Sequence, residues 1–460
     1  MTTKQGVRSP RQFKASIGPR GRRKQRRKLK AGEQEPIPVL PRSPASKAIA
    51  PYSPGSELED SYLRFLIYHC MLSCFGFLKQ NADQPDVTVV CSRTLTCVGP
   101  RFEWYPLAVR DDAFFHSLMS STSSHAAYLQ QVELPRNFYH HRGIAIRLLN
   151  ERLERGDHDE GTINTVCVFA QQEAFEGRPR TASTHITGLL QLVKASGGIE
   201  GLSYDPKTRR HVHFTDLAGA ITLSTKPVLE PTLDISDYNT YFGQPTSATV
   251  SYAQTFRTRL CNFTNSPLSD QAATALWGLR NLTQLRDDFH SGDAFPDTLL
   301  STDLQFTDRV EVLERLVHQL WYVEDSENEQ HAIFRTFGWT CVIYIYIVLR
   351  ELPKELGMNT MLAGRIKATL EAYPDLNVLL ATFNDLFLWQ MFVCGRVADE
   401  RDRNFFASHA TKILIIRKLE DANDILVAAE AFLWPERHVS SAASSSSASR
   451  LDSEMVDIDD

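Results

Sequence analysis

The sequence lacks the short motifs by which many enzyme families are recognised. It has no Gly-x-Ser-x-Gly elbow, no His-Glu-x-x-His pair and no Gly-x-Gly-x-x-Gly turn after a strand. The nearest imitation of a phosphate loop, Gly201 with Lys207-Thr208, lacks the second glycine and the leading strand. The sequence therefore predicts no catalytic residue and no cofactor, and the protein is not expected to be an enzyme. A helical enzyme with an unusual site stays open as an alternative.

Cysteine is sparse and irregularly spaced. None of the eight cysteines forms a Cys-x2-Cys step, and the first of them is Cys70. A zinc cluster needs such closely spaced thiolates, so no metal site is predicted. Cys70 and Cys74 are four residues apart in an apolar run and are interpreted as buried free thiols.

Long hydrophobic runs are also missing. The two longest, residues 65–78 and 339–349, are shorter than the roughly 20 residues that span a bilayer. We interpret them as central core helices and predict no membrane contact. With 42% hydrophobic residues, the chain can still bury a substantial core.

Two pairs of histidines could be mistaken for metal ligands. His116 and His125 are nine residues apart, which places them on opposite faces of one helix. His211 and His213 would diverge by about 200° on a helix. Neither spacing allows joint chelation, so a surface or capping role is predicted for all four.

Two acidic parts of the sequence are candidates for functional groups. Residues 399–402 alternate carboxylates with arginine after Gly395, which predicts a turn and a solvated, charged connection. Asp216 falls within an apolar stripe and is interpreted as a satisfied helix residue. A contact with Arg147 or another basic group is the alternative.

Charge is distributed very unevenly. Residues 1–30 contain twelve Lys and Arg and no acid, so this arm carries +12, whereas the rest of the chain carries −17 within a net charge of −5. The densest part of the arm is formed by Arg20, Arg22, Arg23, Lys24, Arg26, Arg27, Lys28 and Lys30. Such a run predicts nuclear localisation or polyanion binding. Because Phe13 is the only aromatic residue of the arm, DNA contact would be non-specific at most.

Composition divides the chain into three parts. Residues 1–57 combine the basic arm with a Pro/Ser-rich linker, which predicts a disordered segment. Residues 58–435 form the expected helical domain. Residues 436–460 are Ser-rich and then acidic, which predicts a disordered tail that serves either as an activation segment or simply as a solubilising one.

The region 139–225 has a strong helical pattern. Three of its segments repeat apolar residues at i, i+3, i+4 and i+7, namely 163–170, 186–193 and 214–221. The gaps contain the turn signals Gly177-Arg178-Pro179 and Ser196-Gly197-Gly198. This pattern predicts three packed helices and an all-α fold.

Two further stripes extend the helical prediction. Residues 313–320 follow an N-cap expected at Thr307 or Asp308, with Glu311 completing a capping box from Asp308. Residues 376–391 predict one amphipathic helix after the break at Pro374. Residues 87–90 are strand-like and are interpreted as a loop or a small extended segment.

Several stretches of the sequence resemble the fungal-specific transcription factor domain. The resemblance lies in the order and spacing of the segments 104–129, YHHRGIAIRLLNERL (139–153), LLQLVKASGGIEGL (189–202), HFTDLAGAITLSTKP (213–227) and 386–406. It covers roughly residues 57–435. In this family the helical region usually follows a binuclear zinc cluster, and no such cluster occurs in this sequence.

The resemblance implies a nuclear, helical regulator of transcription that acts through partners or an effector. Its expected partners are other transcription regulators or chromatin-associated proteins, together with a small-molecule effector. Trp277, Trp321, Trp339 and Trp389 would form the walls of an effector pocket, unless they are core residues. The alternative function is a cytosolic helical scaffold whose basic arm contacts RNA or acidic partners.

Overall fold

The computed structural model describes residues 107–108, 110–202, 206–230, 237–291, 306–321 and 331–433. Within these residues the chain forms helices joined by turns and contains no strand, which confirms the all-α prediction. The basic arm, the linker, the C-terminal tail, Cys70, Cys74 and residues 87–90 lie outside the described part.

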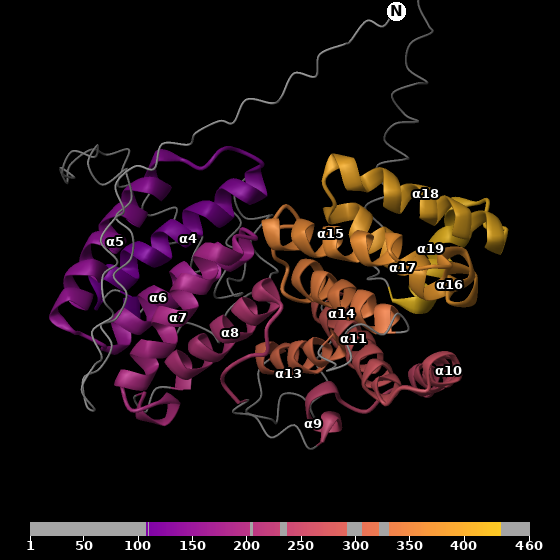
Figure 1. Cartoon of the computed structure of the whole chain (residues 1–460), viewed down its shortest axis with the longest axis horizontal. Helices are drawn as coiled ribbons and strands as arrows, with labels where there is room; N and C mark the ends of the chain where they lie inside the picture. Colours follow the sequence, from indigo (N-terminus) through magenta and orange to yellow (C-terminus); the bar gives the residue numbers. More distant parts are fainter. Residues whose placement is uncertain are drawn as a thin grey trace, which may run out of the picture. The chain divides into compact units, whose positions relative to one another are not determined.

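The helices follow one another along the chain with short connections (Figure 1). They are α4 (Asp112–Gln130), α5 (Arg136–Arg155), α6 (Glu160–Phe175), α7 (Pro179–Ala195), η2 (Ile199–Gly201), α8 (Pro206–Leu223), α9 (Tyr238–Phe242), α10 (Ser247–Thr264), α11 (Leu268–Ser291), α13 (Phe306–His318), η3 (Gln319–Trp321), α14 (Ala332–Tyr344), η5 (Ile345–Leu349), α15 (Gly357–Glu371), α16 (Leu376–Thr382), α17 (Asn384–Val397), α18 (Glu400–Arg417) and α19 (Ala422–Phe432).

The three periodic segments of the sequence are α6, α7 and α8, as predicted. Asp159 caps α6 by accepting the N–H of Thr162 at 2.8 Å, and Pro179 begins α7. Gly177 lies between them at φ +65°, where a Cβ atom would lie 2.7 Å from the backbone of Gly357. A glycine is needed there because the turn after α6 touches the start of α15.

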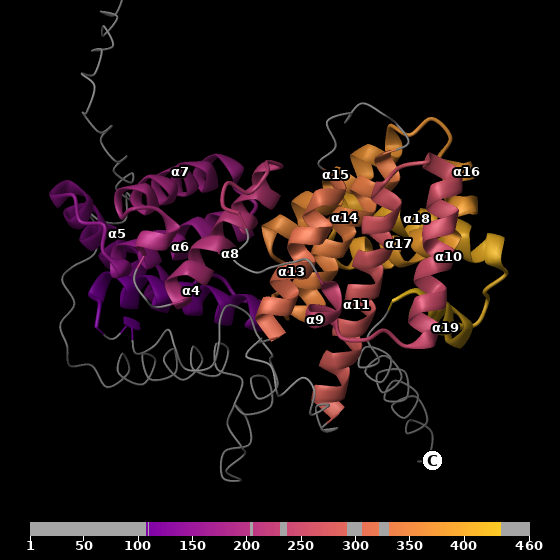
Figure 2. The ribbon, with the colours of Figure 1, turned by 90° about the horizontal axis from the view of Figure 1, so that it is seen from below.

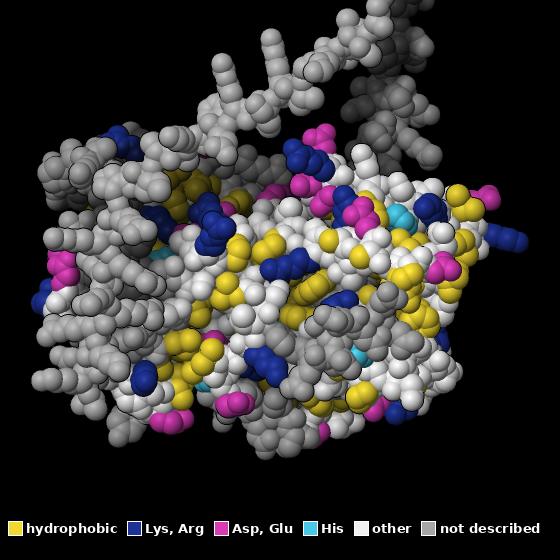
Figure 3. Space-filling view, in the orientation of Figure 1, with side chains coloured by type: hydrophobic (Ala, Val, Ile, Leu, Met, Phe, Trp, Pro, Cys, Tyr) yellow, Lys and Arg dark blue, Asp and Glu magenta, His cyan; other side chains and the backbone are white. Residues whose placement is uncertain are grey.

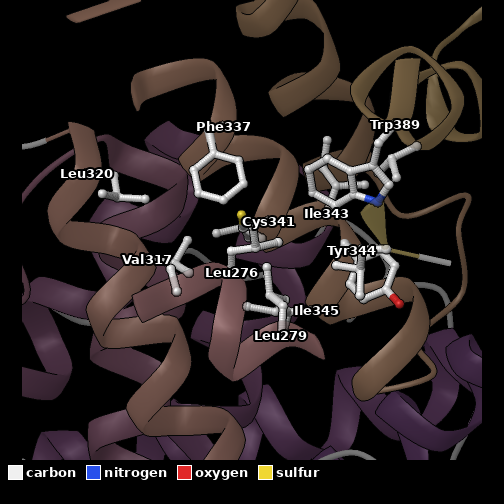
Figure 4. Close-up of a cluster of buried hydrophobic side chains, with 14 of the residues drawn as sticks. Leu276, Leu279, Val317, Leu320, Phe337, Cys341, Ile343, Tyr344, Ile345 and Trp389 are labelled. Carbon is white, nitrogen blue, oxygen red and sulfur yellow. The ribbon is translucent and has the colours of Figure 1, made fainter. Parts of the chain in front are cut away.

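The largest core surrounds α14, which packs against α11, α13, α15 and α17 (Figures 1 and 2). Figure 4 shows buried side chains meeting around Cys341, with Val317 and Leu320 to its left, Phe337 above it and Trp389 to its right. Each fully buried side chain of this kind contributes about 1.5–3 kcal/mol to folding.

The span Ala332–Leu349 is long and apolar enough to cross a membrane, yet 83% of it is buried inside the protein. This burial confirms the prediction that the apolar run 339–349 is a core helix. The hydrophobicity of the segment is explained by its central position between other helices.

Three local predictions were wrong. Residues 376–391 are not one helix, because α16 and α17 bend by 107° at Phe383. The helix α13 begins at Phe306, so Thr307 and Asp308 are inside its first turn instead of capping it. Gly395 lies within α17 and makes no turn. Residues 400–402 form the first turn of α18 and not a connection, and Asp399 is its N-cap, accepting the N–H of Asp402 at 2.9 Å.

Candidate functional site

The single π-helical turn η5 connects α14 to the loop before α15. The N–H of Arg350 bonds to the carbonyl of Ile345 five residues earlier, and beyond the turn the N–H of Leu352 bonds to the carbonyl of Tyr346, both at 2.8 Å. Glu351 follows the turn at φ +50°. Such turns recur at functional sites because the extra residue redirects the side chains around it.

A buried ion pair lies on one side of η5. Arg350 donates from Nε to Glu314 Oε1 at 2.6 Å and from Nη2 to Glu314 Oε2 at 2.7 Å. Its guanidinium lies 4.5 Å from the ring centre of Phe214 on α8. Burial alone lowers the pKa of Arg350, but the carboxylate of Glu314 raises it above its ordinary value. The pair therefore stays charged and joins η5 to α13 and α8.

A second ion pair continues this network along α13. Arg315 donates from Nε to Glu311 Oε1 at 3.1 Å, and both side chains are largely buried. The pKa of Glu311 is raised because burial disfavours its charge, although Arg315 opposes this effect. His213 on α8 is also buried, and its pKa is lowered to about 4 by burial and then by Arg315.

Asp216 fixes the turn that follows α8. Its carboxylate accepts the N–H of Leu229 at 2.8 Å and the N–H of Val228 at 3.2 Å. Burial raises the pKa of Asp216, whereas these two hydrogen bonds lower it. The structural interpretation of Asp216 is thus confirmed, and Arg147 instead pairs with Glu151 on the surface of α5.

A cleft of about 250 Å³ lies beside η5 and the segment that follows it. Its lining residues are Tyr128, Leu129, Gln131, Ile347, Glu351, Leu352, Pro353, Lys354, Glu355 and Arg396. They come from the end of α4, from the η5–α15 connection and from α17. Charges of both signs surround apolar walls, which suits a small polar ligand or a side chain of a partner protein.

Two polar groups of the cleft, those of Glu351 and Tyr128, are held in place by neighbours. Glu351 accepts two hydrogen bonds from Arg286, from Nε at 3.1 Å and from Nη2 at 2.9 Å. The hydroxyl of Tyr128 donates to Glu176 at the end of α6. The cleft is therefore lined by side chains that α6, α11 and η5 position together.

The tryptophans predicted as pocket walls do not line this cleft. Trp389 and Trp321 are buried in the main core, and Trp277 and Trp339 pack against it. The alternative that they are core residues is the correct one. The basic cluster from Arg20 to Lys30 lies outside the described residues.

The surface or capping role predicted for the histidines was wrong for two of them. His211 and His213 are both buried on α8, and His211 Nδ1 lies 2.7 Å from Asn164 Oδ1. His116 Nδ1 on α4 lies 2.8 Å from His141 Nδ1 on α5. His116 and His125 share one helix, α4. No group of three His, Cys, Asp or Glu side chains that could hold a metal ion occurs among the described residues.

Sequence reasoning missed the ion pairs around η5. The i, i+4 spacing of Glu311 and Arg315 was a usable signal for one of them. Glu314 and Arg350 are 36 residues apart, and no local pattern relates them.

The fold and the site define an all-helical domain whose buried charges hold helices together beside a small cleft. A family model described as the fungal specific transcription factor domain matches residues 92–432, which is most of the chain. The protein belongs to this family, which is one of transcription regulators and not of enzymes. No curated protein and no solved structure matches the chain.

Proposed function

We propose that this protein is a nuclear transcription regulator whose helical domain responds to a partner or a small effector bound in the cleft. The observation that carries this proposal is the position of η5. Ile347 and Glu351 line the cleft, whereas Arg350, in the same turn, holds the buried carboxylate of Glu314. An occupant of the cleft is thus one helical turn away from the contacts among η5, α13 and α8.

The buried hydroxyl of Tyr346 supports a second arrangement of this turn. Tyr346 is fully buried, and its hydroxyl has no hydrogen-bond partner. An unmet buried hydrogen bond costs about 1–3 kcal/mol. This cost reduces the free-energy difference between the observed packing of the turn and an alternative packing in which the hydroxyl is bonded. A ligand that prefers that packing shifts the population towards it. Membership of a transcription-regulator family supports reading this shift as control of transcription.

Filling the cleft tests the proposal. Leu129 lines the cleft and is 41% exposed, so Leu129→Trp fills it with little effect on folding. Val132→Trp is the matched control, because Val132 is also exposed but does not line the cleft. In a reporter assay with the full chain tethered to a promoter, Leu129→Trp should change transcription and Val132→Trp should not. Equal behaviour of both variants and the wild type would contradict a role for the cleft.

The nuclear part of the proposal rests on the basic cluster of the arm. The test compares the tagged full-length protein with a variant in which Arg22, Arg23, Lys24, Arg26, Arg27 and Lys28 are changed to alanine. The matched control changes Lys4, Arg8, Arg11 and Lys14, which belong to the same arm outside the cluster. Nuclear signal lost only in the first variant supports an import signal. Cytoplasmic signal in all three would favour a scaffold whose arm contacts RNA or acidic partners.

A further inference from the structure

A serine near the start of α7 is preceded by two arginines. Arg178 and Arg180 lie five and three residues before Ser183. The chain contains four pairs of arginines that are two residues apart, and only this pair has a serine or threonine three residues after its second member. Protein kinases choose their substrates partly by charge pattern. Two arginines at these positions suit a kinase whose substrate cleft is acidic.

The structure leaves this serine accessible. The side chain of Ser183 is half-buried, and its hydroxyl forms no hydrogen bond with a described residue. The neighbouring Thr184, in contrast, donates its hydroxyl to the carbonyl of Arg180 at 3.3 Å. Arg178 and Arg180 are exposed, and Figure 2 shows α7 along the outside of the group formed by α4 to α8. A kinase can therefore reach the hydroxyl and both guanidinium groups.

The first turn of α7 lacks a side-chain cap. Arg178 occupies the N-cap position without a side-chain hydrogen bond to the helix. Helix ends with few such bonds open at low free-energy cost. Because a kinase binds its substrate as an extended segment, α7 has to open by about one and a half turns to present Ser183. An uncapped end makes this opening easier.

Arg180 is placed to bind a phosphate on Ser183. Residues three apart on a helix have neighbouring side chains, and Arg180 forms no ion pair with a described residue. A phosphate adds a charge of about −1.5 to −2 and three acceptor oxygens, which a guanidinium binds strongly. Arg178 is engaged elsewhere, because its Nη1 lies 3.6 Å from Glu173 Oε2 and its Nη2 lies 3.9 Å from Glu176 Oε2.

The surface does not offer a broad basic region instead. On the face drawn in Figure 3, the Lys and Arg side chains are scattered among Asp and Glu side chains. An arginine-directed enzyme therefore has to recognise a short local pattern such as the one before Ser183.

We propose that Ser183 is phosphorylated by an arginine-directed serine/threonine kinase and that Arg180 binds the phosphate. The hydroxyl oxygen of Ser183 attacks the γ-phosphorus of ATP, the bond from that phosphorus to the bridging oxygen of ADP breaks, and the hydroxyl proton passes to a base of the kinase. The two arginines carry +2, so the phosphate makes the start of α7 nearly neutral. This modification is independent of the cleft and of the proposed effector.

Incubation of the folded full-length protein with ATP and a purified kinase of this class tests the proposal. Mass spectrometry with fragment ions that locate the phosphate should find it on Ser183. Ser183→Ala should remove this signal. Thr184→Ala is the matched control and should leave it unchanged, because Thr184 is exposed on the same helix but has no arginine three or five residues before it.

Arginine variants test the recognition. Arg178→Gln and Arg180→Gln should each lower the rate of phosphorylation at Ser183 by about tenfold, because each removes one charged contact with the kinase. Lys194→Gln is the control, since Lys194 is an exposed cation at the other end of α7. Both arginines are exposed, so thermal melting should show an unchanged fold.

The phosphorylated protein tests the contact with Arg180. A guanidinium beside a phosphate favours its doubly charged form and lowers its second pKa. A ³¹P NMR titration should therefore give a lower phosphate pKa in the wild type than in Arg180→Gln that has been phosphorylated by longer incubation. Lys194→Gln should give the wild-type value.

Three outcomes would overturn the proposal. They are a folded protein without phosphate on Ser183, a rate that does not depend on the two arginines, and an equal phosphate pKa in the wild type and Arg180→Gln. A synthetic peptide of residues 176–190 separates sequence from structure. Phosphorylation of the peptide but not of the folded protein would show that α7 does not open, and this result would also reject the site.

Discussion

The interiors of the two halves of the described chain are built differently. In α4–α8, polar side chains are buried and bonded across helices. Three hydrogen bonds of 2.7–2.8 Å join α6 to α8, namely Gln171–Thr215, Asn164–Thr208 and Asn164–His211. Around α14, by contrast, the buried side chains are mostly aliphatic or aromatic. The hydroxyls of Thr336 and Thr340 donate to carbonyls of their own helix, and the one bond of these two residues to another helix is the long contact of Thr340 with Cys394 Sγ at 3.9 Å.

This difference shows how one chain separates specificity from stability. Buried hydrogen bonds add little net free energy, but a shift of register leaves their partners unpaired, so they select one arrangement of α6 against α8. The core around α14 gains from burial of apolar area, which is large and non-directional. The cleft and η5 lie between helices of the two kinds.

Acidification should give the clearest difference in stability between the two halves. Burial lowers the pKa of His185 and His213 to about 4 and that of His211 to about 3, against 6.5 in the unfolded chain. The unfolded chain therefore binds more protons below pH 6.5. Stability falls by about 1.4 kcal/mol per pH unit for each such histidine until its folded pKa is reached. Hydrogen exchange at pH 5 should show α6–α8 opening before α14.

Replacing His213 sharpens this test. Neither ring nitrogen of His213 has a hydrogen-bond partner, so His213→Leu should reduce the acid sensitivity without loss of stability at pH 7. His158→Gln on the exposed surface is the control and should leave the pH dependence unchanged. If α14 and α8 were equally sensitive to acid, the proposed difference between the two interiors would be contradicted.

The apolar core should show the largest effect of a single substitution. Trp389 is fully buried, and its ring centre lies 5.1 Å from that of Phe432 and 5.8 Å from that of Tyr344. Trp389→Ala should cost about 4 kcal/mol of unfolding free energy, because it leaves a large cavity. Urea denaturation measures the change. Trp339→Ala, at a partly buried position, should cost clearly less.

Breaking the ion pair beside η5 should cause the second largest loss of unfolding free energy. Arg350→Met should cost about 3 kcal/mol, because it leaves the carboxylate of Glu314 buried without its cation. The double variant Arg350→Met with Glu314→Leu should recover most of that loss in the same urea measurement. A double variant no more stable than Arg350→Met would show that the charges themselves are needed for folding.

A polar contact between α6 and α8 should have the smallest effect. Gln171→Leu should cost about 1 kcal/mol, since Thr215 loses one hydrogen-bond donor. In a double-mutant cycle with Thr215→Val, the combined loss should be smaller than the sum of the two single losses. Strict additivity would mean that this bond couples nothing across the helices.

The sequence predicted the helices well wherever one helix buries one face. The stripes that became α6, α7 and α8 are of this kind. The prediction of one helix over residues 376–391 was wrong because the apolar periodicity continues through the bend at Phe383. Arg259 on α10 holds both sides of this bend, donating to the carbonyl of Thr382 at 2.9 Å and to Asp385 at 2.8 Å. A contact from more than 120 residues away leaves no trace in the local pattern.

The surface prediction for the histidines was wrong for a related reason. Polar residues such as His211 and His213 suggest a surface when they are considered singly. They are buried because other helices cover both faces of α8, and His211 also has Asn164 as a hydrogen-bond partner. Burial of a polar residue depends on these distant partners.

The sequence by itself determined the helical class, the turns between α6, α7 and α8, the basic arm and the family. Each of these depends on residues close together in the chain or on their order. Only the tertiary structure decided the pairing of Glu314 with Arg350, the cleft beside η5 and the accessibility of Ser183 on α7. These features depend on which helix faces are covered by other helices, and that is fixed by packing between segments far apart in the sequence.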